Sequence, residues 1–316
     1  MRTGRASWVR LRTALLWLVL LAAMATLSLY ASAYTVIMVT NILLYVILTM
    51  SWVLFSAPTG YISLATAAFF GVGIYTAAIL GEQLPLPLVI LTAGLASFCL
   101  AALVGALTLR LKGVYFAFFT FGLVELIKYL LLWYEVNITG VRGRFVVFAD
   151  NFTIYYIILG ILVALLLTSY LIRRSRIGLA LQSIGEAEDA AAHIGINVSA
   201  VKTIVFAISA VFVGAAGAAM ATRWTYVDPY MAFDYTYSFT AIAMAVFGGL
   251  GRFEGPILGA VVFAFLRELL ITQFAYVYML VMGTVLVVTI LYLPQGLVQL
   301  AQIPLWRKLR GKREPA

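Results

Sequence analysis

Apolar residues in this chain form long runs that recur from the N-terminal region almost to the C-terminus. Most runs are close to the roughly 20 residues that a helix needs to cross a bilayer. They occupy about 13–30, 34–56, 60–81, 85–109, 114–133, 154–172, 201–221, 236–250, 256–272 and 276–293. The pattern predicts an all-α, polytopic membrane helical bundle with about 10 transmembrane helices, formed by a single domain over residues 1–316.

Two parts of this pattern allow more than one topology. The first run could be a signal peptide, with Ala31-Ser32-Ala33 as a cleavage site. It is longer than the usual apolar core of about 7–15 residues, so an uncleaved first span is favoured. The runs 236–250 and 256–272 are short and lie close together. They predict either two tilted spans or a broken or re-entrant pair.

The composition supports a membrane protein and argues against an enzyme. Hydrophobic residues make up 64% of the chain and charged residues only 10%, far from the values of soluble domains. The single cysteine, Cys99, lies in an apolar run, so there is neither a disulfide framework nor metal-ligand spacing. The chain carries no nucleotide, zinc or dinucleotide motif. We therefore expect no catalytic residues, no cofactor and no metal site.

The basic residues of the loops predict how the chain is oriented. If the N-terminus starts inside, the outer side receives only Arg142, Arg144 and Arg223. The inner side receives the N-terminal arginines, Arg110, Lys112, Arg173, Arg174, Arg176, Lys202, Arg252 and the basic tail 305–316. Cytoplasmic loops carry the excess of Lys and Arg, which predicts N-in and C-in termini in a bacterial or archaeal inner membrane. The net charge of +9 then faces membrane lipid and not nucleic acid.

The longest polar stretch, 173–202, is predicted to be a cytoplasmic loop. Ser183 and Glu186 have the spacing of a capping box, which predicts a helix of about ten residues that starts near Ser183 and stops at Gly195. Its polar face is acidic, whereas helices that lie on a membrane surface usually carry Lys and Arg there. An interfacial connector remains an alternative, but the pattern favours a helix that offers a face to another protein.

Small and polar residues inside the apolar runs give candidates for a translocation path. Pairs such as Gly71 and Gly73 allow close helix packing, which is their ordinary use, or a path lined by small residues. Glu125 and Lys128 are spaced so that they can pair on one helix face. Arg267 and Glu268 are adjacent and cannot face the same way. These charges lie near the outer ends of their runs, so snorkelling to water is an alternative to a pathway role.

The polar stretch RSRIGLALQSIGEAEDAAAHIGINVSAVK resembles the cytoplasmic loop of inner-membrane permeases of ABC importers for branched-chain amino acids, specifically the M-type of their two permease subunits. Three further stretches support the resemblance in order and spacing. They are GYISLATAAFFGVG from Gly60 to Gly73, LRLKGVYFA from Leu109, and GGLGRFEGPILG from Gly248 to Gly259.

The resemblance implies a coupling helix with an E-A-A-x-x-x-G core that inserts into a groove of an ATPase subunit. Asp189, Ala190, Ala191 and Gly195 match this spacing, with aspartate in place of glutamate. The candidate ATPase-coupling residues are Ser183, Gly185, Glu186, Glu188, Asp189, Ala190, Ala191 and Gly195. The candidate pathway residues are Asn41, Ser63, Gly71, Gly73, Glu125, Gly248 and Gly249.

The resemblance also implies the partners and the mechanism. They are two ABC ATPase subunits, a second homologous permease and an extracytoplasmic substrate-binding protein, which would meet the aromatic-rich outer loops around 137–151 and 222–235. A branched-chain (aliphatic) amino acid is the expected substrate, and urea, short amides and aromatic acids are alternatives within the same class of importer. A stand-alone secondary transporter, for which we see no inverted repeat, and a membrane scaffold are the alternatives from other classes.

Overall fold

The computed structural model describes residues 23–27, 30–109, 111, 113–274, 276–292 and 296–297. Its helices are α2 (Ala33–Thr59), α3 (Thr66–Leu80), α4 (Leu86–Thr108), α5 (Val114–Tyr134), the π-helical η1 (Glu135–Thr139), α6 (Asn151–Arg174), α7 (Arg176–Glu186), α8 (Glu188–His193), α9 (Val198–Ala221), α10 (Pro229–Ala232), α11 (Thr236–Gly248), α12 (Glu254–Gln273) and α13 (Tyr278–Tyr292). The strands β1 (Arg144–Phe145) and β2 (Tyr226–Val227) form one short antiparallel pair. The expectation of a helical membrane bundle is confirmed.

Six of the described helices are long and apolar enough to cross a membrane: α2, α4, α5 with η1, α6, α9 and α12. α3 and the apolar part of α13 are shorter, and α11 has only 13 residues. The predicted count of about 10 spans is therefore not reached by length within the described residues, and the orientation of the termini stays a prediction. Most of the predicted first span and the tail 305–316 lie outside the described residues.

Local sequence explains where the main helices begin and end. The Ser32 hydroxyl caps α2 by accepting a hydrogen bond from the Thr35 amide, and α2 ends at Gly60, whose φ of 72° is left-handed. Asp150 caps α6 through the Phe152 amide at 3.1 Å. Asn197 caps α9 in the same way through the Ala200 amide at 3.1 Å. These caps fix the register with which the apolar faces enter the bundle.

Glycines allow α3, α9 and α4 to pack with their backbones in contact. A Cβ atom on Gly73 would lie 2.0 Å from the carbonyl oxygen of Gly214 in α9. A Cβ atom on Gly217 would lie 2.3 Å from the carbonyl oxygen of Phe70 in α3. Gly214 faces Ser97 of α4 on its other side. Close approach through small residues is how helices associate in lipid, so these three helices form one tightly packed block.

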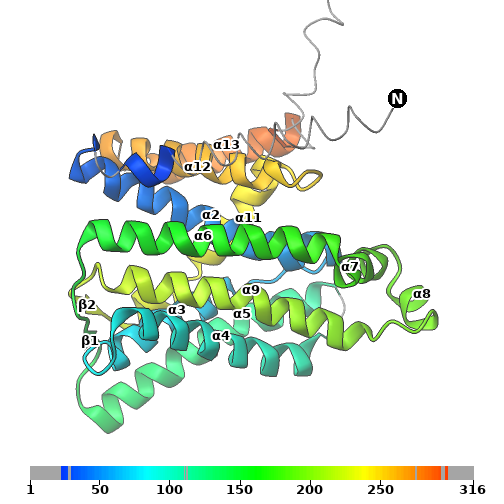
Figure 1. Ribbon diagram of the computed structural model, residues 1–316, viewed down its shortest axis with the longest axis horizontal. Helices are drawn as coiled ribbons and strands as arrows, with labels where there is room; N and C mark the ends of the chain where they lie inside the picture. The colour runs from blue at the N-terminus through cyan, green and yellow to red at the C-terminus, as the bar shows by residue number, and fades with distance from the viewer. Residues whose placement is uncertain are drawn as a thin grey trace, which may run out of the picture.

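Loops that the sequence places on opposite sides of the membrane lie at opposite ends of the bundle (Figure 1). β1 and β2 join the loops after η1 and after α9 at one end, with Arg144 opposite Val227 and Phe145 opposite Tyr226. We call this the β end. α7 and α8 lie at the other end, next to the start of α9 (Figure 1). The long helices α4, α5, α6 and α9 therefore alternate in direction as the predicted topology requires.

Candidate coupling site

The helix break within 173–202 lies elsewhere than the sequence predicts. α7 starts at Arg176, where the Ser175 hydroxyl caps it by accepting a hydrogen bond from the Gly178 amide at 3.4 Å. Ser183 lies in the last turns of α7, and its hydroxyl donates to the Leu179 carbonyl at 3.1 Å. The capping-box prediction is therefore wrong. A serine inside a helix satisfies its hydroxyl on the preceding turn, and burial of Leu181 and Ile184 extends the helix past the apparent cap.

The chain turns at Ala187 and then forms α8, which is a separate helix of 6 residues. Ala187 is extended, with φ −155° and ψ 96°, so α7 and α8 point in different directions. Gly195 has a φ of 90°, and its amide donates to the Ala192 carbonyl at 3.0 Å. The prediction that Gly195 ends the helix is confirmed, because a left-handed residue after a helix is usually glycine.

The two faces of α8 differ in exposure. Ala191 is buried against the bundle. Asp189, Ala190 and Gly195 are exposed, and Ile194 just after the helix is 75% exposed. In α7, Gly185 and Glu186 are both exposed, and Gly185 also approaches α2 so closely that a Cβ atom there would lie 2.1 Å from the Pro58 carbonyl oxygen. The candidate coupling residues thus divide into an outward-facing group and a group that packs on the bundle.

Glu188, the first residue of α8, joins this helix to the bundle through a buried lysine. Lys202 of α9 is 1% exposed, and its Nζ lies 2.8 Å from Glu188 Oε1, 2.9 Å from the Leu109 carbonyl oxygen and 3.1 Å from the Tyr61 hydroxyl oxygen. The Tyr61 hydroxyl in turn donates to Glu188 Oε2 at 2.6 Å. We call Lys202, Glu188, Tyr61 and the Leu109 carbonyl the Lys202 cluster.

The charge and all three hydrogens of the Lys202 ammonium group are satisfied within the Lys202 cluster. An ammonium group has three hydrogens, and each has an acceptor here. The ammonium also lies 4.3 Å from the centroid of the Tyr61 ring, a cation–π contact. Burial, followed by the hydrogen bond to Glu188 and the charges of Glu188 and Asp189, raises the pKa of Tyr61 above its ordinary value. The phenol therefore stays protonated at neutral pH and remains the donor to Glu188.

Tyr61 belongs to a non-helical segment, residues 60–65, that separates α2 from α3. Side chains from other helices satisfy the backbone of this segment. Trp52 Nε1 donates to the Ser63 carbonyl at 2.8 Å, the Leu64 amide donates to Thr120 Oγ1 at 3.0 Å, and Ser238 Oγ donates to the Leu64 carbonyl at 2.7 Å. Irregular backbone inside a membrane protein needs such partners. The Lys202 cluster thus links α8 to a segment that is held by α2, α5 and α11.

A small hydroxyl-lined pocket lies beside this segment, between α2, α3 and α9. It has a volume of about 10 Å³, which is roughly enough for one water molecule. Ser51 Oγ and Ser56 Oγ are buried there without a hydrogen-bond partner among the described residues. Its other polar lining residues are Ser63, Thr66 and Ser209. The interior of the bundle is therefore polar at this point and has room for about one water molecule.

The candidate pathway residues do not gather into one site. Gly71 packs against the Phe233 ring and Gly73 against α9, while Gly248 packs against Gly255 and Gly259 of α12. Gly249 is buried at the end of α11, where its φ is 96°. Lys128 and Glu125 form the expected pair, with Nζ and Oε1 2.6 Å apart.

Asn41 has a charged partner that the sequence does not reveal. Its Oδ1 accepts a hydrogen bond from Arg223 at 2.7 Å, just beyond α9 at the β end. Burial lowers the pKa of Arg223, and the negative charge of Glu268 opposes this change. An amide, a cation and an anion therefore lie near one another here. They are Asn41 of α2, Arg223 of the loop after α9 and Glu268 of α12.

Sequence reasoning missed Lys202 and Tyr61 as functional residues. It counted Lys202 only as a loop charge and Tyr61 only as part of an apolar run, whereas the two are hydrogen-bonded across 141 positions. One signal was available: Lys202 lies in the second turn of α9, where an apolar helix follows directly. A lysine inside such a helix needs an acidic partner, and Glu188 is close in sequence.

Comparison of the sequence with known proteins identifies the family of the chain. The family model described as "branched-chain amino acid transport system / permease component" matches residues 34–290. The permease protein LivM of the high-affinity branched-chain amino acid transport system of Salmonella typhimurium is 30% identical over 302 residues, which cover 83% of this chain and 69% of that protein. LivM of Escherichia coli K12 is 30% identical over 306 residues, covering 85% and 71%.

A more distant match is the permease protein LivH of the same Escherichia coli transport system. It is 27% identical over 135 residues, which cover 42% of this chain and 43% of LivH. No solved structure matches the chain. The match over residues 34–290 and the identity to LivM over most of the chain lead to one conclusion: the chain belongs to the family of permease components of branched-chain amino acid transport systems.

Proposed function

We propose that this chain is the permease subunit of an ABC importer that carries branched-chain amino acids across the cytoplasmic membrane. The complete importer also contains two separate ATPase subunits, a second permease and an extracytoplasmic binding protein. The observation that carries the proposal is the Lys202 cluster together with the exposed face of α8. This arrangement offers a short helix to a partner and ties the same helix firmly to the bundle.

The proposed coupling starts at the exposed residues of α8 and at Ile194. Asp189 and Ala190 contact the groove of an ATPase subunit, so the α7–α8 end faces the cytoplasm. Closure of the ATPase dimer displaces α8, and Glu188 passes the displacement to α9 through Lys202 and to segment 60–65 through Tyr61. Because α9 has no free space against α3 and α4, the three helices move as one body.

The substrate path is proposed to run from the β end toward the small, hydroxyl-lined pocket beside Ser63. An amino acid is a zwitterion, and Arg223 and Glu268 present opposite charges near Asn41 at the β end. These charges complement a carboxylate and an ammonium group, whereas urea or a short amide is neutral. These two opposite charges and the names of the LivM relatives therefore favour an amino acid over those alternatives.

The β end is proposed to receive the binding protein. Arg142 Nη2 and Asp228 Oδ2 lie 2.7 Å apart and join the two loops on either side of the β1–β2 pair. Phe145 and Phe148 are 74% and 65% exposed there. Exposed aromatic residues on a platform of fixed shape are typical of protein interfaces.

The decisive experiment is to isolate the chain from its native membrane in mild detergent and identify the co-purifying proteins by mass spectrometry. We expect two ATPase subunits and a second permease, and ATP hydrolysis that rises when the binding protein and a branched-chain amino acid are added. Leucine uptake by the chain alone, driven by an ion gradient, would instead show a secondary transporter. Co-purification without uptake or stimulated hydrolysis would show a scaffold.

A further inference from the structure

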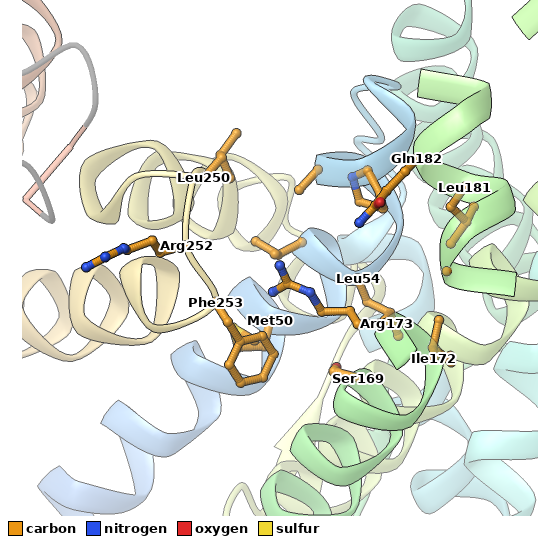
Figure 2. Close-up of a pocket in the computed structure, with 14 residues that line it drawn as sticks. Met50, Leu54, Ser169, Ile172, Arg173, Leu181, Gln182, Leu250, Arg252 and Phe253 are labelled. Atoms are coloured by element: carbon orange, nitrogen blue, oxygen red, sulfur yellow. The ribbon is translucent and has the colours of Figure 1, made fainter. Parts of the chain in front are cut away.

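A second pocket, of about 190 Å³, lies between α2, α6, α7 and the loop that joins α11 to α12. Figure 2 shows its lining side chains, which come from segments far apart in the sequence. Ser169, Arg173 and Gln182 line its polar side, and residues of α2 line its apolar side. The pocket lies near the α7–α8 end and does not include the Lys202 cluster.

Its polar side holds a cation without an acidic partner. Arg173, in the last turn of α6, projects into the pocket and lies against the Phe253 ring, with its guanidinium carbon 5.3 Å from the ring centroid (Figure 2). Among the described residues Arg173 forms no ion pair, and none of the lining residues is acidic. Arg252 also lines the pocket, but Figure 2 shows its side chain pointing away from Arg173.

A buried hydroxyl without a partner lies next to this cation. Ser169 is 2% exposed, and its Oγ makes no hydrogen bond among the described residues. Ser169 precedes Arg173 by one helical turn, so the two side chains share a face of α6. Gln182 of α7 adds an amide, which points toward the same space in Figure 2. A buried hydroxyl usually has a partner, so this one is available to donate a hydrogen bond to an oxygen atom of a bound molecule.

The opposite side of the pocket is apolar and follows α2 toward its middle. Met50, Val53, Leu54 and Ala57 of α2 form this wall. About 14 Å of helix rise separates Met50 from Thr59 at the end of α2. The cation, in contrast, lies in the last turn of α6, where the predicted cytoplasmic loop begins. A ligand that fills the pocket therefore needs an anionic end and a hydrocarbon end.

We propose that this pocket binds an anionic phospholipid of the cytoplasmic leaflet. Its phosphate accepts hydrogen bonds from Arg173, Ser169 and Gln182, and the start of one acyl chain lies against the α2 wall. The leaflet assignment rests on the proposed function, which places the α7–α8 end in the cytoplasm. A lipid bound there bridges α6 and α7 to the α11–α12 loop, so its loss loosens the support on which α8 stands.

The test uses the intact importer complex in detergent, with native mass spectrometry after titration with phosphatidylglycerol or phosphatidylcholine. We expect phosphatidylglycerol to be retained preferentially by the wild type. Arg173→Gln is expected to weaken its binding at least about tenfold, because a charge-assisted contact is lost. Arg174→Gln is the matched control. Arg174 is the next residue in the sequence, its guanidinium carbon lies 4.4 Å from the centroid of the Tyr170 ring, and it does not line the pocket.

A second variant guards against a misfolded protein. Ser169→Ala removes only the unpartnered hydroxyl, so it leaves the net charge unchanged and is expected to weaken phosphatidylglycerol binding without lowering the thermal stability of the complex. Equal lipid binding by the Arg173→Gln and Arg174→Gln complexes would overturn the inference. Displacement of the lipid by millimolar inorganic phosphate would reduce the pocket to a simple anion site and would also overturn it.

These outcomes are independent of the proposed transport function. Lipid retention is read from the mass of the complex and needs neither uptake nor ATP hydrolysis. A complex that transports leucine but shows no lipid preference contradicts only the lipid site. A chain that isolates without ATPase subunits but retains phosphatidylglycerol through Arg173 contradicts only the importer.

Discussion

Lys202 shows how one residue can determine the behaviour of a helix to which it does not belong. A buried ammonium is costly unless every hydrogen has an acceptor, and here the acceptors come from α8, from segment 60–65 and from the end of α4. Removing the cation leaves Glu188 without its counter-ion next to the Tyr61 phenol. The effect should therefore be felt in α8 and not only in α9.

Lys202→Met is accordingly expected to separate ATP hydrolysis from transport. Glu188 remains 23% exposed, so water lessens the penalty, and we expect a loss of roughly 1–3 kcal/mol in the stability of the complex. Leucine uptake per ATP hydrolysed should fall while ATPase subunits still co-purify. Arg174→Met is the control, since it removes a cation from the same end of the bundle that packs on the Tyr170 ring and not on the Lys202 cluster, and it should leave the ratio unchanged.

At the scale of elements, the sequence predicts the helices better than it predicts their breaks. Long apolar runs predict α2, α4, α6 and α9 within a few residues, because a bilayer permits little else. The predicted helix start near Ser183 is wrong because Ser183 and Glu186 form only a local pattern, whereas burial of α7 against α2 decides where that helix lies. The Lys202 cluster could not be predicted, since it joins residues that meet only after the bundle has packed.

The two serines near α7 give a direct test of this correction. Ser175→Ala removes the cap that the structure shows and should cost about 1 kcal/mol of helix stability. Ser183→Ala removes a hydroxyl that only returns to the preceding turn, so its cost should be close to zero. Thermal unfolding of the purified complex, compared between the two variants, measures the difference. An equal loss of stability in the Ser175→Ala and Ser183→Ala variants would instead support Ser183 as a helix cap.

α8 itself is tested by reversing a charge on its exposed side. Asp189→Lys should leave the chain inserted and assembled with the second permease, but it should abolish coupled uptake, because the ATPase groove meets the wrong charge. Uptake and co-purification are measured on the same membranes. Glu82→Lys, an exposed acidic residue between α3 and α4 at the far end, should have no effect on coupling. Normal transport by the Asp189 variant would contradict the assignment of α8 as the coupling helix.

At the scale of the whole molecule, the helices that connect the two ends differ in how tightly they pack. The glycine contacts join α3, α4 and α9 into one block, whereas α5 lies at the periphery and α11 is short. Such a molecule can transmit a signal from the β end to the α7–α8 end only by moving whole helices. A receptor docked at one end and an ATPase at the other would therefore sense each other mechanically.

Arg142→Glu tests this long-range communication. The substitution breaks the pair with Asp228 and places two acids together, which should separate the loops that form the β end. We expect the basal ATP hydrolysis of the complex to persist and its stimulation by the binding protein to fall several-fold. The control Arg174→Glu changes charge at the opposite end and should leave receptor stimulation intact. Unchanged stimulation in the Arg142 variant would exclude this end as the receptor platform.

The completeness of the Lys202 cluster has a consequence for how the importer responds to its ionic environment. Dissolved ions weaken charge interactions that water can reach, over distances of about 10 Å at moderate salt, and affect buried ones far less. Lys202, which pairs with the first residue of α8, is buried and fully hydrogen-bonded, whereas Asp189 on the outer side of α8 is exposed. Rising salt should therefore weaken the binding of the permease to the ATPase at a lower concentration than it weakens the ion pair that holds α8 to the bundle.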